Sequence, residues 1–184
     1  MSVTFPKTVG QIEYNFPFKK GSHGRQPRND DPNGTGKTRV QGALYPFGYG
    51  LSYTTFAYSE LTVEPVDGAV WKVSCRVENT GRRAGAEVVQ LYVRDLFSSV
   101  VTYDSVLRGF EKVELERGES KRVDFVLTAD DFAILDKDMQ WTVEPGDFEI
   151  MIGASSEDIR LKTTVKLGKH DQISAHLSHT LPTP

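Results

Sequence analysis

The amino-acid sequence predicts an all-β fold, a β-sandwich of about seven strands. Between residues 53 and 167, apolar and polar residues alternate in one short segment after another, which is the pattern of half-buried strands. Turn signals rich in Gly, Pro, Asn and Asp separate these segments. About seven segments within roughly 115 residues give the size and spacing of an immunoglobulin-like sandwich.

The expected strands follow each other closely along the chain. They cover residues 54–66, 71–77, 88–93, 107–115, 123–127, 141–152 with a turn at Pro145 and Gly146 inside it, and 159–165. We expect 107–115 and 123–127 to pair through the turn at 117–119, and the turn at 153–158 to close a second hairpin. Residues 128–135 are the one predicted helical turn, with Thr128 as its cap and Asp130 and Asp131 in its first turn.

Composition limits the class of protein. The chain has 184 residues, 38% of them hydrophobic, and a net charge of −3, which does not indicate a nucleic-acid-binding surface. No apolar run reaches the ~20 residues of a transmembrane helix. Cys75, the single cysteine, excludes an internal disulfide framework and is predicted to be a buried small hydrophobe. Because the paired cysteines of antibody domains are missing, a fibronectin type III-like variant is preferred.

Neither end of the chain carries a long strand pattern: in residues 1–20 short alternating apolar pieces are broken by Pro6 and Gly10, and residues 168–184 lack periodicity. We expect an irregular N-terminal arm, and residues 19–43 have the composition of a linker or loop. His23, Asp30 and Asp31 in this linker could be imagined as a metal or acid/base cluster, but a solvated loop is favoured. Residues 168–184 are predicted to be a tail.

Residues 45–56, which read YPFGYGLSYTTF, form a predicted elbow before the first long strand. Pro46 fixes its own φ, and Gly48 and Gly50 permit backbone approaches that a side chain would block. This run resembles the segment that leads into the C-terminal domain of glycoside hydrolase family 3, the β-glucosidase and β-xylosidase family. Further similarity lies in VENTG at 77–81, AGAEVVQLYV at 84–93 and VEPGDF at 143–148.

The resemblance implies a division of the chain and a role for it. Residues 1–43 would be a remnant of the preceding α/β catalytic domain with a linker, residues 44–167 the fibronectin type III-like sandwich, and residues 168–184 a tail. The parent enzyme would be a retaining β-glucosidase or β-xylosidase acting on a β-glucoside or oligosaccharide. Family members carry the nucleophilic Asp and the acid/base Glu in other domains, and no residue here matches either motif. This chain alone is therefore expected to be an inactive accessory or stabilising domain.

Candidate functional residues within the sandwich are few. The carboxylates most open to a catalytic reading are expected to serve turns and caps: Asp95, Asp104, Asp130, Asp131, Asp136 and Asp138. Four aromatic residues could form a sugar-stacking platform, although core packing is favoured: Trp71, Phe125, Trp141 and Phe148. The loop after residue 93 carries exposed-looking apolar residues, and Phe97 and Tyr103 are the candidates for contact with the catalytic domains, against simple edge-strand packing.

Two other functions remain open. A free-standing carbohydrate-binding module would need an exposed row of aromatics, and an adhesion or interaction module would show tandem copies, whereas the sequence has no internal repeat. The expected partners are the catalytic domains of the same parent chain, with no nucleic acid, membrane, metal or cofactor, and with a homo-oligomer allowed. A periplasmic or secreted parent protein and a cytoplasmic one both remain open.

Overall fold

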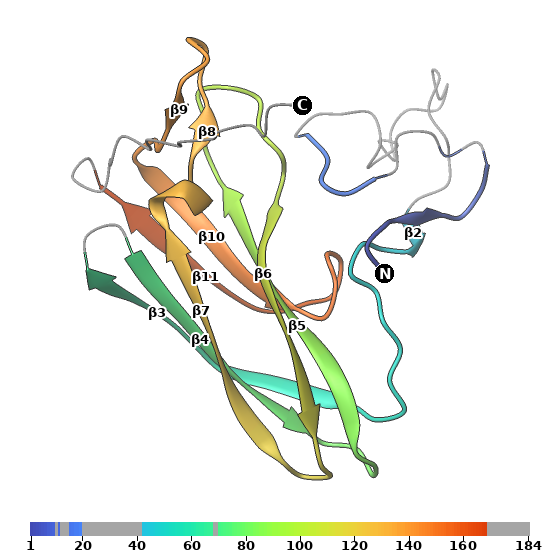
Figure 1. Cartoon of the computed structure of the whole chain (residues 1–184). Coiled ribbons are helices and arrows are strands. Elements are labelled where there is room, and N and C mark those ends of the chain that lie inside the picture. Colours follow the sequence, from blue (N-terminus) through green and yellow to red (C-terminus); the bar gives the residue numbers. More distant parts are fainter. Residues whose placement is uncertain (10, 12–14, 20–41, 68–69, 169–184) are drawn as a thin grey trace, which may run out of the picture.

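A computed structural model describes residues 1–9, 11, 15–19, 42–67 and 70–168. The sandwich consists of seven antiparallel strands in two sheets (Figure 1), which confirms the predicted all-β class and strand number. One sheet has the order β11-β10-β5-β6, with bounds Ile159–Leu167, Gly146–Gly153, Gly85–Asp95 and Val106–Leu115. The other has the order β3-β4-β7, with bounds Phe56–Asp67, Val70–Asn79 and Ser120–Thr128.

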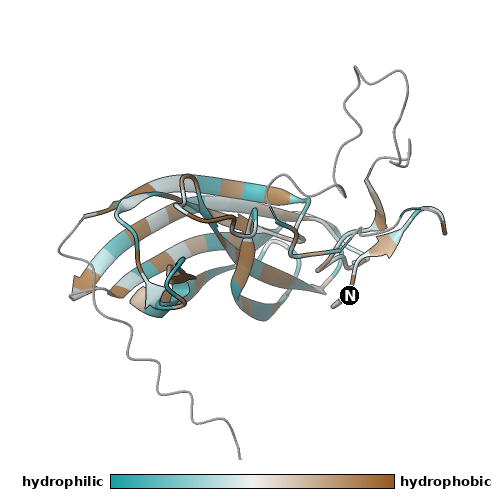
Figure 2. Cartoon of the chain, turned by 90° about the horizontal axis from the view of Figure 1, so that it is seen from above, coloured by the Kyte–Doolittle hydropathy of each residue, from teal (hydrophilic) through white to brown (hydrophobic). Residues whose placement is uncertain are grey.

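The core lies between the two sheets and is built from the alternating apolar residues of each strand. In β4 the buried set is Trp71, Val73, Cys75 and Val77. Strands β5 and β10 of the other sheet contribute Val89, Leu91, Val93, Phe148, Ile150 and Ile152. Figure 2 shows the resulting alternation of hydrophobic and hydrophilic residues along the strands. The period of two therefore places one face of each sheet in a shared interior.

One predicted pairing is wrong. Strands β6 and β7 do not form a hairpin: β6 pairs with β5, and β7 pairs with β4. The turn between them carries the chain from one sheet to the other. Both strands alternate with period two and both face the same core, so the sequence pattern does not reveal which sheet each one joins. The predicted hairpin between β10 and β11 is confirmed.

Shorter elements lie at the end of the sandwich where β7 finishes. A 3₁₀ turn, η1, covers Ala129–Asp131, and the Asp131 carboxylate accepts hydrogen bonds from the Thr128 N–H at 2.8 Å and the Thr128 hydroxyl at 3.2 Å. The two-residue strands β8 (Ile134–Leu135) and β9 (Trp141–Thr142) form a small hairpin beside it. Because this hairpin projects beyond the two sheets, Trp141 is 47% exposed, and its predicted core position is wrong.

The described part of the N-terminal arm lies on the β5 side of the sandwich (Figure 1). Strands β1 (Phe5–Pro6) and β2 (Ala43–Tyr45) pair with each other. Phe16 stacks on Phe47 and packs edge-on against Tyr92 of β5. His23, Asp30 and Asp31, for which a solvated loop was favoured over a metal or acid/base cluster, fall outside the described residues, as does the expected tail beyond residue 168. Within the described ranges, no helix is long and apolar enough to cross a membrane.

Cys75 is buried in the core, as predicted, and burial raises the pKa of its thiol from 9.0 to about 11. At pH 8 we expect the folded chain to react with a thiol reagent more than about a hundredfold more slowly than the unfolded chain. Timed thiol labelling with and without denaturant checks this expectation. Equal labelling rates in both conditions would contradict it.

The raised pKa of the Cys75 thiol also affects the pH dependence of stability. The free energy of unfolding falls as pH rises from about 9 to about 11, because the unfolded state loses the thiol proton first.

Candidate functional site

The loop at residues 96–105, between β5 and β6, is held in place by charged side chains. Arg94 donates to the backbone oxygen of Asp104 at 3.1 Å and to its carboxylate at 2.7 Å, and also donates to Glu149 of β10 at 3.1 Å. At the start of the loop, the Asp95 carboxylate accepts from the Phe97 N–H at 3.0 Å. The Ser99 N–H donates to Glu144 at 2.9 Å, so the loop is also tied to the segment that leads into β10.

The two candidate residues of this loop point into different surroundings. Phe97 is 81% exposed, and Tyr103 is 45% exposed. Tyr103 forms an isolated β-bridge with Lys19, and the Asp104 N–H donates to the Phe18 carbonyl at 2.8 Å. The N-terminal arm thus covers one end of the loop, whereas the side chain of Phe97 at the other end is exposed to solvent.

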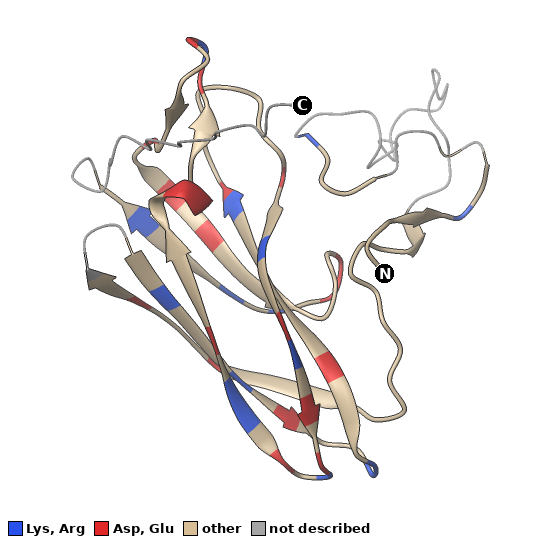
Figure 3. Cartoon of the chain, viewed as in Figure 1, with Lys and Arg blue, Asp and Glu red and all other residues tan. Residues whose placement is uncertain are grey.

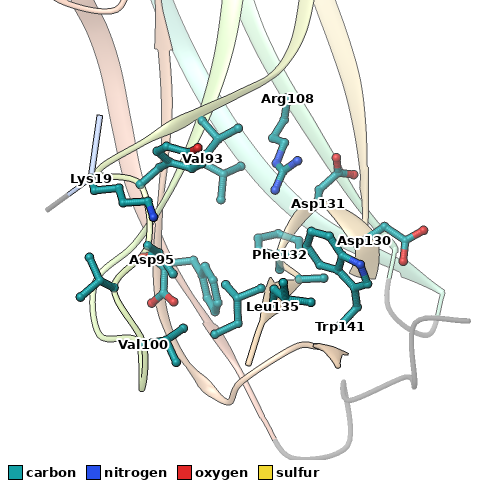
Figure 4. Close-up of a pocket in the computed structure, with 17 residues that line it drawn as sticks. Lys19, Val93, Asp95, Val100, Arg108, Asp130, Asp131, Phe132, Leu135 and Trp141 are labelled. Atoms are coloured by element: carbon teal, nitrogen blue, oxygen red, sulfur yellow. The ribbon is translucent and has the colours of Figure 1, made fainter. Parts of the chain in front are cut away.

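A cleft of about 700 Å³ lies between this loop and the η1 and β8–β9 region (Figure 4). Six apolar residues form much of its lining: Val93, Val100, Phe132, Ile134, Leu135 and Phe148. Tyr103 lines the cleft, but Phe97 does not. The sequence pattern indicated the loop but not the cleft, because the wall opposite the loop comes from η1 and β8–β9, about 30 positions further along the chain.

The polar groups of the cleft carry both signs of charge. Lys19 and Asp95 lie at one side, and Arg108, Asp130 and Asp131 lie at the other (Figure 4). Burial lowers the pKa of Arg108, and the nearby Asp131 carboxylate opposes that shift. The Arg108 Nε–H and the Thr102 hydroxyl, both lining the cleft, are buried without a hydrogen-bond partner among the described residues.

The elbow at residues 45–56 is fastened to the outer face of the four-stranded sheet. The Gln90 side-chain amide of β5 donates to the Gly48 carbonyl at 3.0 Å and to the Ala154 carbonyl at 2.7 Å, and its oxygen accepts from the Tyr92 hydroxyl at 2.5 Å. The Ser156 N–H donates to the Phe47 carbonyl at 2.9 Å. Burial raises the pKa of Tyr92. The sequence predicted the elbow but did not identify Gln90 as its anchor.

The candidate carboxylates serve the backbone in several cases. Asp95 and Asp131 accept from backbone N–H groups of their own turns, as described above. Asp136 accepts from the Asp138 N–H at 2.9 Å and the Gln140 N–H at 2.8 Å. Acidic and basic residues are interspersed over the sandwich (Figure 3). The described residues contain no group of three or more His, Cys, Asp or Glu that could hold a metal ion.

Comparison with known proteins decides the type of domain. A family model for the fibronectin type III-like domain matches residues 87–156. A β-xylosidase of Formosa agariphila is 42% identical over 169 residues, which cover 89% of this chain and 22% of that protein. Thermostable β-glucosidase B of Acetivibrio thermocellus is 48% identical over 128 residues, covering 67% of this chain and 17% of that protein.

A solved structure agrees with both sequence comparisons. The GH3 β-glucosidase of Bifidobacterium adolescentis superposes with a TM-score of 0.67 at 36% identity, covering 72% of this chain and 19% of that chain. The chain carries the fibronectin type III-like domain of family 3 β-glucosidases and β-xylosidases. This fibronectin type III-like domain spans only about a fifth of the length of these relatives.

Proposed function

We propose that this fibronectin type III-like domain is a non-catalytic support of a larger family 3 glycoside hydrolase. It packs against the catalytic domains of the same chain and stabilises them. The observation that carries the proposal is the firmly anchored loop at 96–105, which presents the large apolar side chain of Phe97 at 81% exposure. A domain that spans a fifth of its relatives' length has neighbouring domains available to bury such a residue.

The activity of the parent is proposed from the relatives. Those relatives are β-glucosidases and β-xylosidases, so the parent would hydrolyse a terminal β-linked glucose or a related sugar. Retaining hydrolysis needs two carboxyl groups roughly 5 Å apart across one sugar. In this domain Asp95, Asp131 and Asp136 instead bind backbone N–H groups of turns. We therefore expect the 184-residue chain alone to have no glycosidase activity.

Replacing Phe97 and Tyr103 by Ser in the full-length enzyme tests the supporting role. We expect faster thermal inactivation, because burying each aromatic against another domain is worth about 1.5–3 kcal/mol. The half-life of activity at elevated temperature is the measurement, together with the relative rates on glucoside and xyloside substrates.

Val126→Ser is the matched control for this pair. Val126 is a similarly exposed apolar residue, but it lies on β7 of the three-stranded sheet and outside the loop. The control is expected to leave the inactivation rate unchanged. If the Phe97 and Tyr103 variant also shows unchanged stability and unchanged substrate preference, the proposed contact is wrong.

A further inference from the structure

The cleft beside η1 has the dimensions and the mixed lining of a small-molecule site. Its volume of about 700 Å³ falls within the range of ~300–1,000 Å³ that is typical of ligand pockets. Its floor is apolar, with Val93, Phe132, Leu135 and Phe148 among the lining residues. A few polar groups stand at its sides, which is the arrangement that fixes the orientation of a bound molecule.

Two buried polar groups in this cleft lack partners within the described residues. The Arg108 Nε–H is a donor, and the Thr102 hydroxyl can both donate and accept. Buried polar groups are almost always hydrogen-bonded, since leaving one unpaired is costly. Both groups line the same cleft, so one occupant with hydrogen-bonding atoms could satisfy them together.

The charges of the cleft select the chemical class of that occupant. Two cationic side chains, Lys19 and Arg108, line the cleft together with three carboxylates, Asp95, Asp130 and Asp131, so each side carries both signs of charge. An anion would be attracted by the two cationic side chains and repelled by the three carboxylates. A cation would be attracted by the carboxylates and repelled by the cationic side chains. A neutral molecule with several hydroxyl groups pairs with both sets, because a hydroxyl donates to carboxylates and accepts from guanidinium groups.

Trp141 gives the cleft an exposed aromatic face at its edge. Its indole is 47% exposed and lies beside Asp130 at the edge of the cleft (Figure 4). An exposed indole offers a flat apolar face, and a pyranose ring offers a matching face of C–H groups. We propose that this cleft binds a neutral sugar, with its ring against Trp141 and its hydroxyl groups on Arg108 and Asp130. The cleft shares Tyr103 with the proposed domain contact, but Arg108 and Trp141 lie outside the loop at 96–105 and Phe97 does not line the cleft, so each proposal can fail without the other.

The test uses the ¹⁵N-labelled 184-residue chain, titrated separately with glucose, xylose, cellobiose and xylobiose while NMR spectra are recorded. A ligand of this size in a partly open cleft should bind with millimolar affinity. We expect saturable shifts for the amides of Thr102, Arg108 and Phe132 and for the Trp141 indole. Absence of shifts at these residues up to about 50 mM sugar would mean that water alone satisfies the buried groups, and would overturn the proposal.

Variants separate this site from non-specific binding. Trp141→Ala removes an aromatic from a hairpin outside the core, so the sandwich stays folded, and Arg108→Lys keeps the charge but removes the Nε–H. Each should weaken binding by about tenfold. Phe110→Ala is the control, because Phe110 is an exposed aromatic of β6 that does not line the cleft. Unchanged affinity in both cleft variants, or shifts with sodium acetate but none with the sugars, would also overturn the proposal.

Discussion

Replacement of Asn79 by Asp is expected to destabilise the chain by about 3–5 kcal/mol at pH 7. Asn79 is 0% exposed at the end of β4. Its amide nitrogen donates to the carbonyls of Arg83 at 2.7 Å and Leu115 at 3.0 Å. Its side-chain oxygen accepts from the Thr54 hydroxyl at 2.6 Å and from the Gly81 N–H at 3.1 Å. An aspartate has the same shape, but it would place a carboxylate oxygen where the amide nitrogen donates. Both hydrogen bonds to the carbonyls would be lost, and the oxygens would repel each other.

The penalty should depend on pH. Burial next to carbonyl oxygens would raise the pKa of the new carboxyl group above its unfolded value of roughly 4. The unfolded state would then ionise first as pH rises, so stability would be lost between pH 4 and neutrality. The difference in unfolding free energy between Asn79→Asp and the unchanged chain should therefore be smaller at pH 4 than at pH 7.

Urea denaturation at the two pH values measures this difference. Asn15→Asp makes the same chemical change at an exposed position and is expected to alter stability by less than about 0.5 kcal/mol. An equally small effect of Asn79→Asp at pH 7 would show that the bonds around Asn79 do not hold the strand ends together.

Replacement of Gly48 by Ala is expected to cost more than about 3 kcal/mol. Gly48 has φ of +81°, a conformation that L side chains rarely adopt, and an added Cβ would overlap the Gln90 side-chain oxygen. Moving Gln90 away would break its bonds to the carbonyls of Gly48 and Ala154. Backbone strain and the lost bonds therefore act in the same direction.

Substitutions at two other glycines separate the cost of backbone strain from the cost of displacing Gln90. Gly118 has φ of +75° but open space around it, so Gly118→Ala should cost only about 1–2 kcal/mol of backbone strain. Gly50 has neither a positive φ nor a neighbour near its added Cβ, so Gly50→Ala should be nearly neutral. Thermal and urea denaturation of the three variants gives the order. Equal stability of Gly48→Ala and Gly118→Ala would contradict the contact with Gln90.

Much of the sandwich could be predicted because its signal is local. The alternation in β4 places Cys75 and Val77 inside, and the sequence shows this period directly. The cap at Thr128 was predictable for the same reason, since its acceptor Asp131 is three residues away. Sheet membership was harder to predict, and the pairing of β6 with β7 failed because both strands carry the same local pattern.

The elements of the candidate site depend on distant partners. Gln90 interrupts a run of apolar residues in β5, which is a weak signal of a buried polar role, but its partners Gly48 and Ala154 are far away in the sequence. Arg108 joins the cleft only because β6 and η1 lie at the same end of the fold. Trp141 shared the alternating pattern of a core strand, yet the β8–β9 hairpin extends past the sheets and exposes it.

Hydrogen–deuterium exchange tests the supporting role most directly. The isolated 184-residue chain is compared with the same residues inside the full-length enzyme, and peptides covering the loop at 96–105 report the contact. We expect these amides to exchange at least about tenfold more slowly in the full-length enzyme, because the neighbouring domain covers the loop. The turn at 116–119, at the opposite end of the sandwich, should exchange equally in both. Identical exchange of the loop in both proteins would contradict the proposal that this domain supports its neighbours through Phe97 and Tyr103.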